Sequence, residues 1–416
     1  MSEFKASGFR DEFGSGGPDL VGITTMTSPY YFVPPSGSTA ERPSSPPPGM
    51  LRFNTDIGRL EVWRNDHWAT ILGESPNLGI TNSGITTASA GTGTRAIYGG
   101  GGPAPATTTI DYFSISSLGT AIAWGAAITQ SRTTLAGFAS RTRGCWAAGT
   151  IGVGPYYNDT IDFVTIASTG SCTDFGNVTT ARTNGDSAVS NGTRGCIGGG
   201  GVPAGASDII DYVEIASTGN AVDFGNLSVA RNDPGGAFSS SVRGIFTGGY
   251  SHGPSVYYNT IDYITISTTG NAQDFGDTTD KIARSGGLSS ATRGVVGGGR
   301  NPSTNPVDTI NFTTIATTGN AQDFGNLATG VSFTAGTSSP TRGVWAGGYQ
   351  SPGGTHSDVI QYVEIASTGN AVDFGDLSDA RGALGGFSNG HGGLQSCQNL
   401  RLQVLVMNLV VVVPIL

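Results

Sequence analysis

Short runs in which apolar and polar residues alternate recur along most of this chain. Residues 260–266, which read TIDYITI, are a typical run, and Gly, Asn, Ser and Thr residues separate it from its neighbours. Alternation with a period near two is the pattern of a half-buried β-strand. No stretch has the i, i+3, i+4 spacing of a long amphipathic helix, so the pattern predicts an all-β protein.

The runs belong to a repeat of about 50 residues. Each unit opens on an arginine before a short apolar run, continues with an isoleucine-led run and contains an aromatic-Gly pair. The opening arginines are separated by 48, 51, 49, 50 and 49 residues, and His391 stands at the next expected position. The arginines are Arg95, Arg143, Arg194, Arg243, Arg293 and Arg342, the isoleucines are Ile110, Ile161, Ile210, Ile261, Ile310 and Ile360, and the pairs begin at Trp124, Phe175, Phe224, Phe275, Phe324 and Phe374.

Each unit contains four strand-like runs, which we call A to D. Run A resembles GGLSS, run B RGVVGGG, run C TIDYITI and run D AQDFGDL, and a T-G-N turn of hairpin type joins C to D. One four-stranded sheet of this size buries too little apolar surface to be stable alone, whereas sheets arranged in a ring bury their faces against each other. The last segment, 380–394, has A and B character only, and we expect it to pair into the first unit.

The repeat resembles the Kelch β-propeller repeat. In one unit, Gly248-Gly249, Tyr263, Phe275 and Arg284 would fill the four characteristic positions of that family. The chain departs from the family in having Phe where Trp is usual, except at Trp124, and Ala148-Gly149 in place of one Gly pair. The resemblance implies a six-bladed propeller over residues 85–394, or a seven-bladed one if flanking strands complete another sheet.

A different composition precedes the repeats. Residues 34–48 are rich in proline, which predicts a stiff, extended linker, and residues 49–73 read as a β-hairpin whose second strand carries Leu60, Val62, Trp68 and Ile71. A single hairpin is too small to be stable alone. We predict an anchoring segment and linker at 1–48, a β-hairpin attachment module at 49–73, the propeller at 85–394 and an apolar tail at 395–416, read either as an added strand or as a poorly specified tail.

The hairpin resembles short modules near the attachment ends of bacteriophage tail-fibre and other virion appendage proteins. The residues that carry this resemblance are MLRFNT at 50–55 and LEVW at 60–63, and the T-I-D-Y and T-G-N-A-x-D-F-G strings are similar to structural proteins of marine phages. The resemblance implies a virion protein, exposed to the extracellular environment, that forms a homotrimer through residues 1–80 and contacts other virion proteins there.

Charge and cysteine content narrow the function classes. The formal net charge is −9 and the chain has 12% charged residues without a basic cluster, which argues against nucleic-acid binding. The four cysteines have no C-x-x-C spacing, so we expect no metal site and no cofactor. Residues 402–416 are apolar but too few for a helical membrane span, and we expect none.

Residues shared by all units are interpreted as structural. We expect the opening arginines to form ion pairs within their own units, with aspartates at two repeated positions as partners. Cys145 and Cys196 stand where other units have Ile or Val, and we expect them to be buried apolar residues. The D-F-G string recurs without the other kinase motifs, so it carries no catalytic meaning. The aspartates are Asp111, Asp162, Asp211 and Asp262 at the first position, and Asp174, Asp223, Asp274, Asp323 and Asp373 at the second.

Binding residues are expected where the units differ, because variable loops on a rigid scaffold usually carry recognition. The loops between runs B and C differ in length and contain tyrosines, whose flat ring and hydroxyl suit a sugar. The alternative is that these loop tips only pack on neighbouring loops. The predicted ligand-binding residues are Tyr156, Tyr157, Tyr250, His252, Tyr257, Tyr258, Arg300, Tyr349 and His356.

The function expected from sequence is that of a phage tail fibre or virion appendage protein whose propeller binds a host-surface glycan or another virion protein. One alternative is a purely structural decoration protein, and a second is a carbohydrate-active enzyme that uses the loop face. No catalytic histidine pairing or metalloprotease motif is present among the four histidines, so we expect no enzymatic activity.

Overall fold

The computed structural model describes residues 34–70 without 45 and 65, and residues 94–394 without 104, 153–155, 254, 304 and 351–353. The chain divides into two compact units, residues 1–82 and 83–416. Within the described ranges the regular structure is β-strand with two short 3-10 helices, and no helix there is long and apolar enough to cross a membrane. The prediction of an all-β protein is confirmed. The apolar tail at 395–416 lies outside the described residues.

The first unit contains a four-stranded sheet rather than the two-stranded hairpin expected from the sequence. Its order is β1-β2-β3-β4, with β1 parallel to β2 and the other pairs antiparallel. The predicted return strand is two strands, because the chain turns between Arg64 and His67 and pairs back on itself. The Pro-rich segment is not simply extended, since it supplies β1 and η1. The bounds are β1 (Ser36–Gly37), η1 (Thr39–Glu41), β2 (Leu51–Asn54), β3 (Arg59–Arg64) and β4 (His67–Thr70).

A buried carboxylate holds this small sheet together. Glu61 on β3 is fully buried and accepts hydrogen bonds from Arg42 and Asn54. Its hydrogen bond with Arg42 is the main cause that lowers the pKa of Glu61 below its usual value. The charge on Glu61 therefore ties the segment after η1 to the sheet, which a two-stranded hairpin could not do.

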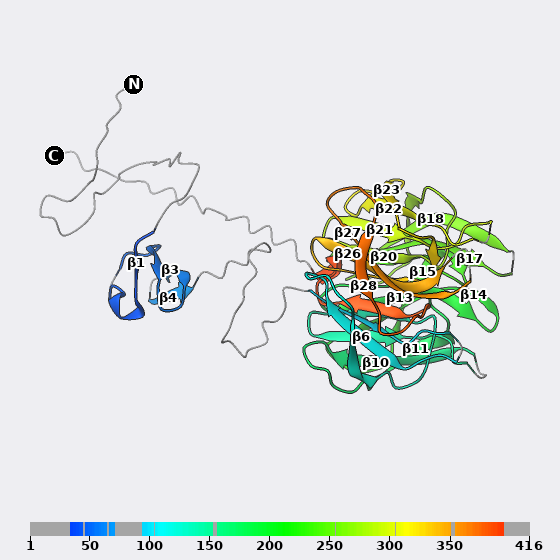
Figure 1. Ribbon diagram of the computed structural model, residues 1–416, viewed down its shortest axis with the longest axis horizontal. Coiled ribbons are helices and arrows are strands. Elements are labelled where there is room, and N and C mark those ends of the chain that lie inside the picture. The colour runs from blue at the N-terminus through cyan, green and yellow to red at the C-terminus, as the bar shows by residue number, and fades with distance from the viewer. Residues whose placement is uncertain are drawn as a thin grey trace, which may run out of the picture. The chain divides into compact units, whose positions relative to one another are not determined.

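The second unit is built of small antiparallel sheets that follow one another along the chain (Figure 1). In each of them the predicted runs lie side by side across the sheet in the order A, B, C and D. The first sheets are β8 (Ala136–Ala139), β9 (Arg143–Ala147), β10 (Asn158–Thr165) and β11 (Thr173–Arg182); β12 (Ala188–Ser190), β13 (Arg194–Val202), β14 (Gly205–Glu214) and β15 (Val222–Arg231); and β16 (Ala237–Ser239), β17 (Arg243–Ser251), β18 (Val256–Thr265) and β19 (Gln273–Asp277).

The remaining sheets have the same strand order. One of them has an extra strand, and another combines a strand from the end of the repeats with three strands from their beginning. They are β20 (Gly286–Ser289), β21 (Arg293–Gly297), β22 (Thr309–Thr314) and β23 (Gln322–Asn326); then β24 (Val331–Ser332), β25 (Ala335–Ser338), β26 (Arg342–Gln350), β27 (His356–Glu364) and β28 (Val372–Asp376); and β29 (Gly385–Ser388) with β5 (Arg95–Gly99), β6 (Thr109–Ser114) and β7 (Ile122–Ala127). The short helix η2 (Gly392–Leu394) follows β29.

The sheet that contains β5 takes its first strand from the other end of the repeats. β29 pairs antiparallel with β5, and Gly385 lies opposite Gly99. The A strands contact one another in the order β8, β12, β16, β20, β25 and β29, and β29 also contacts β8. The segment after residue 380 therefore supplies the A strand of the sheet that contains β5, β6 and β7, as its sequence predicts.

Buried ion pairs connect neighbouring units, which corrects the pairing expected from the sequence. The aspartates of run C pair with an arginine at the end of the preceding unit, and not with the opening arginine of their own unit. For Arg182 and Asp211 the distance from Nη1 to Oδ2 is 2.9 Å, and both side chains are fully buried. The other pairs are Arg132–Asp162, Arg231–Asp262 and Arg381–Asp111.

Two junctions between units have no such pair, and there both partners are neutral. Ile282 and Val331 each lie seven residues after the aromatic residue of run D, and Arg182 lies at the equivalent position of its own unit. The aspartate position is then Asn311 or Gln361. Thr279 donates a hydrogen bond to Asn311, as Thr179 does to Asp211. Charge is therefore present on both sides of a junction or on neither, as burial in a low-dielectric interior requires. Arg284, expected to fill the Kelch arginine position, does not form one of these pairs.

The opening arginines serve a different junction. Arg243 donates to the carbonyl of Ile315, 72 residues later, and its guanidinium lies 4.7 Å from the ring centre of Tyr263. Arg194 and Arg342 also form ion pairs within their own units, with Glu214 and Glu364. The repeated arginine is thus structural, as expected, but its repeated partner is the next unit and not an aspartate of its own.

Candidate functional site

Six equivalent residues precede the A strands and are linked to one another by backbone hydrogen bonds. We call them the loop ring, and they are Thr134, Gly185, Pro234, Arg284, Phe333 and Ala383, each about 50 residues from the next. The N–H groups of Arg284, Phe333 and Ala383 donate to the ring carbonyl of the preceding unit, at 2.8–3.1 Å. Thr134 donates to Ala383, and Gly185 donates to Thr134.

Proline leaves the ring open at one link. Pro234 has no N–H, so it cannot donate to the carbonyl of Gly185. Among the described residues, no hydrogen bond reaches that carbonyl. Among the described residues, the loop ring therefore has no backbone hydrogen bond between Gly185 and Pro234.

Five of the six loop-ring residues, all except Pro234, share a left-handed backbone, although their side chains differ. Thr134, Arg284, Phe333 and Ala383 have φ values of 51–60°, a left-handed conformation that costs a residue with a side chain about 1 kcal/mol and glycine almost nothing. Glycine is used at only one of the six positions. Side chains are therefore retained where glycine would be more stable, which is expected of a recognition position.

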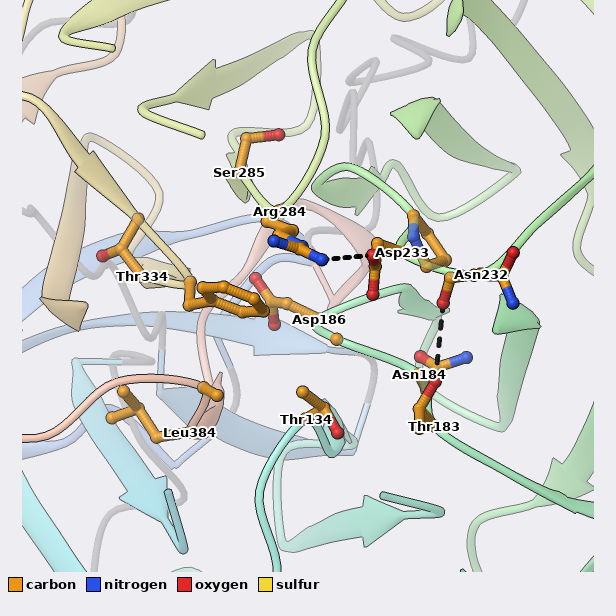
Figure 2. Close-up of a pocket in the computed structure, with 14 residues that line it drawn as sticks. Thr134, Thr183, Asn184, Asp186, Asn232, Asp233, Arg284, Ser285, Thr334 and Leu384 are labelled. Carbon is orange, nitrogen blue, oxygen red and sulfur yellow. Dashed lines mark hydrogen bonds and ion pairs between the residues drawn. The ribbon is translucent and has the colours of Figure 1, made fainter. Parts of the chain in front are cut away.

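A pocket lies among these loops. Figure 2 shows it, with Asp186, Asp233 and Arg284 around it. It is small, with room for about one water-sized molecule. All six loop-ring residues line it, so every unit contributes to one site. We call it the loop pocket. Its remaining lining residues are Thr183, Asn184, Asn232, Ser285, Thr334 and Leu384.

One aspartate of the pocket is paired with two basic side chains. Asp233 Oδ2 lies 2.6 Å from Arg284 Nη2 and 3.0 Å from His252 Nε2. The guanidinium of Arg284 also stacks on Phe333, 4.6 Å from its ring centre. Its Nε is buried and has no hydrogen-bond partner among the described residues. The Nε atoms of Arg132, Arg182, Arg300 and Arg381 are likewise buried without a partner among the described residues, so this feature is not particular to the pocket.

The second aspartate of the pocket is buried. Asp186 accepts a backbone hydrogen bond from Gly336, on the A strand of another unit, at 3.3 Å. Burial is the main cause that raises the pKa of Asp186 well above its usual value, although hydrogen bonds from Gly336 and Gly287 act in the other direction. Burial therefore favours the protonated form of Asp186 over its charged form.

Three of the predicted binding residues gather beside this pocket. The ring of Tyr250 lies 4.5 Å from that of Tyr257 and 4.9 Å from that of His252. His252 bonds to Asp233, which lines the pocket, and Tyr250 forms a backbone bridge with Asp233. We call Tyr250, His252 and Tyr257 the tyrosine cluster. The loops after run B and run D therefore meet at one end of the sheets, as their strand directions predict.

The other predicted residues do not join that cluster. Arg300, Tyr349 and His356 form a second group, in which Tyr349 lies 5.6 Å from His356 and 5.7 Å from the Arg300 guanidinium. Burial lowers the pKa of His356 from its usual value. Tyr156 is 64% exposed, and Tyr157 bridges to Thr150.

Tyr258 is not part of the surface that Tyr257 forms. Adjacent residues of a strand point to opposite faces of the sheet, so Tyr257 faces Tyr250 while Tyr258 points away from it.

The pocket residues themselves were not predicted from the sequence. Asp186, Asp233 and Arg284 lie in the loops between runs D and A, which have similar lengths and no aromatic tip.

A second small cavity lies between the A strands, and both Asp186 and His391 line it. Serines of the A strands surround it, and Ser239, Ser289 and Ser338 each donate to the carbonyl of the serine in the preceding unit at 2.7–2.8 Å. Ala139 stands at the equivalent position in one unit, and there His391 contacts its carbonyl at 3.1 Å.

The short helix η2 sits against the A strands at the end away from the loop pocket. A Cβ atom on Gly393 would lie 1.7 Å from the carbonyl oxygen of Ser190, and one on Gly392 would lie 2.1 Å from that of Ser290. Only glycine fits so close an approach. The segment after β29 therefore fills this end, and the loop pocket is at the opposite end.

No cluster of three or more His, Cys, Asp or Glu side chains that could hold a metal ion occurs in the described residues. Cys145 and Cys196 are buried as free thiols in apolar surroundings, as expected. Comparison with known proteins finds no matching family model and no matching curated protein.

Proposed function

We propose that the second unit is a six-bladed, Kelch-like propeller and that the chain is a phage tail fibre or virion appendage protein that binds a host-surface glycan. The cyclic order of contacts between the A strands and the pairing of β29 with β5 support the ring of six sheets. The resemblance of the N-terminal sheet residues to virion attachment modules supports the location. In this proposal residues 1–80 anchor the protein to other virion proteins as a homotrimer.

One observation carries the binding role. The tyrosine cluster adjoins a polar pocket to which every unit contributes, at the end of the sheets where the loops differ most. Tyrosine and histidine rings offer apolar faces, and their polar atoms lie at the edge, where a sugar hydroxyl can bond. Residues common to all units instead bond to neighbouring units, which leaves recognition to these variable side chains.

A glycan array with the purified full chain tests the proposal. We expect selective binding to surface polysaccharides, and we expect Tyr257→Ala to weaken it about tenfold, since loss of an aromatic contact costs 1 kcal/mol or more. Val242→Ala is the control, because Val242 is 58% exposed in the turn between runs A and B, at the other end of the sheets. Equal weakening by both variants, or no glycan bound at all, would contradict the proposed role.

Location on the particle tests the virion assignment separately. Antibody labelling of particles viewed by electron microscopy should find the protein at an exposed fibre or appendage. Absence from the particle would refute the virion role whatever the array shows, and a position on the particle without any glycan binding would favour a structural decoration protein.

A further inference from the structure

Each unit has one residue directly after the glycine pair of run B (Ala148-Gly149 in one unit), and these residues differ in size from unit to unit. In three consecutive units they are Tyr250, Arg300 and Tyr349, which we call the loop arc. The A strands of these units, β16, β20 and β25, contact one another in that order. In the other three units the residues are Gly102, Thr150 and Gly201. Large side chains therefore lie on three neighbouring units and small ones on the rest.

The backbone of the loop arc is fixed. Arg300 forms antiparallel bridges with Ala283 on one side and Pro306 on the other. Its N–H donates to the carbonyl of Ala283 at 2.7 Å, and the N–H of Ala283 donates back at 2.9 Å. Tyr250 and Tyr349 pair with the equivalent residues of their own units. Side chains on so constrained a backbone lose little freedom when a ligand binds.

The guanidinium of Arg300 has no acceptor among the described residues. Every other arginine in the described part of the second unit donates to a carboxylate or to a backbone carbonyl. The Nε of Arg300 is buried, whereas its two Nη atoms are not. The nearby carboxylate of Asp233 is already paired with His252 and Arg284. Arg300 therefore presents a positive charge through Nη1 and Nη2 that no acid of the described chain neutralises.

Aromatic side chains hold this charge in place. The guanidinium carbon of Arg300 lies 5.7 Å from the ring centre of Tyr349, within the range of a cation–π contact. Tyr349 in turn lies 5.6 Å from the ring of His356, its cross-strand partner. Burial lowers the pKa of His356 from its usual value of 6.5, so the imidazole is mainly neutral at neutral pH. Arg300 therefore supplies the charge of this group.

We infer that the loop arc binds an anionic substituent of an acidic glycan, an inference that rests on the proposed glycan binding. The two Nη atoms of Arg300 donate to the oxygens of a carboxylate or a sulfate, which a guanidinium can bind through two parallel hydrogen bonds. The rings of Tyr250 and Tyr349, on the units to either side, contact the neighbouring sugars. A neutral glycan would leave the guanidinium without a charged acceptor.

The formal net charge of −9 does not oppose this contact at short range. At physiological ionic strength, exposed charges are screened from one another beyond about 8 Å, whereas a charge-assisted hydrogen bond acts at contact distance. The affinities are therefore to be measured at about 0.15 M salt, where the contact decides the preference and the net charge does not.

Titration calorimetry of the full chain with paired oligosaccharides tests the inference. The probes are oligosaccharides of glucuronic, galacturonic and mannuronic acid, each paired with its carboxyl-reduced counterpart, and sulfated dextran oligosaccharides paired with dextran. At least one acidic member should bind about tenfold or more tightly than its neutral counterpart. A preference in a uronic-acid pair identifies the substituent as a carboxylate, and a preference in the dextran pair alone identifies it as a sulfate.

Failure of the inference and failure of the proposed function give different results. Equal affinities within every pair, or binding of neutral glycans only, would overturn the inference and leave the proposed function standing. Binding of no glycan at all would overturn both.

Arg300→Gln removes the charge but keeps a polar side chain. It should reduce the preference for acidic probes about tenfold and leave the affinity for neutral ones unchanged. The matched control is Lys281→Gln, which removes the same charge from an exposed lysine between β19 and β20, at the same end of the sheets. Equal loss of preference in both variants would show that only overall charge matters and would overturn the assignment of Arg300.

Arg300→Lys separates the two parallel donors from the charge. It keeps the positive charge without the planar pair of nitrogens, so its preference should lie between those of the wild type and of Arg300→Gln. A preference equal to that of the wild type would overturn the two-donor contact.

Polyglutamate tests whether the arc selects a glycan over an acidic protein segment. We expect it to bind more weakly than the best acidic oligosaccharide, because it has no sugar rings for Tyr250 and Tyr349 to contact. Equal or tighter binding of polyglutamate, abolished by Arg300→Gln, would overturn both this inference and the proposed glycan function.

Discussion

The buried ion pairs between units make a quantitative prediction about stability. Asp211→Asn removes the negative charge opposite Arg182 but keeps a side chain that can still accept the hydrogen bond from Thr179. At 2.9 Å, two unit charges attract each other by about 6 kcal/mol in a medium of effective dielectric constant 20. Removing one partner of a buried pair usually costs about 3–5 kcal/mol, because the other charge stays buried without compensation.

The double variant Arg182→Ile with Asp211→Asn should restore most of that loss. It reproduces the neutral junction at Ile282 and Asn311, where a threonine also donates to the amide. Replacing a complete buried pair by neutral residues is often close to neutral in free energy, so we expect the double variant within about 1 kcal/mol of the wild type.

Urea unfolding followed by tryptophan fluorescence measures both free energies, since Trp146 and Trp345 are buried among the sheets. The matched control is Glu214→Gln, which removes an ion pair with Arg194 at the same 2.9 Å distance but with the glutamate half exposed. We expect a loss below about 1 kcal/mol there. A cost below 1 kcal/mol for Asp211→Asn, or a double variant as unstable as the single one, would refute the charge-matching argument.

Three further predictions concern the second unit. Burial lowers the pKa of His391 to about 4 from 6.5, so the unfolded chain takes up a proton at a higher pH than the folded chain does. The free energy of unfolding should therefore fall by about 2 kcal/mol between pH 6.5 and 4. Urea titrations of His391→Gln should lack that part of the pH dependence. Gly276→Ala would place a Cβ 2.6 Å from the carbonyl of Gly319 at φ +144°, so its thermal midpoint should fall well below that of Gly270→Ala, which has a similar φ but nothing within 4 Å; equal midpoints would contradict this. Burial raises the pKa of Cys172 to about 12 and leaves Cys145 and Cys196 fully covered, so residue-resolved mass spectrometry after thiol alkylation should find slow labelling of Cys172 and none of the other two before unfolding.

The strands of the second unit could be predicted from the sequence because every unit repeats the same alternation and turn residues. The supply of β29 by the C-terminal segment also followed, since the segment 380–394 has A and B character but no C or D run after it. These features depend on local pattern and on the need to bury one face of each sheet, and both are readable along the chain.

The partners of the repeated charges could not be read in the same way. Asp211 recurs once per unit, and its sequence position does not say whether an arginine of the same unit or of the preceding one reaches it. Asp211 goes with Arg182 of the preceding unit, and Asn311 goes with Ile282 of the preceding unit. This correspondence identifies the partner, but it is recognised only once the structure shows which residues face each other between units.

The candidate site was predicted in part. The tyrosine cluster contains three of the nine expected residues, and the remainder lie in a second group or on separate loops and strand faces. The loop pocket was missed because its residues come from loops of nearly constant length in all units, where backbone conformation, not composition, brings them together. The first unit was likewise underestimated, because a two-residue strand such as β1 leaves no periodic signal.

The pairing of β29 with β5 has a consequence for how the protein is made. The sheet that begins at residue 95 receives its innermost strand only after the ribosome has added residues 385–388, close to 300 residues later. Until then β5 has an unpaired edge, and a chain that stops early keeps that edge for good. A nascent protein of this kind needs protection during translation, and any premature stop yields a product that quality control can recognise by its one unfinished sheet.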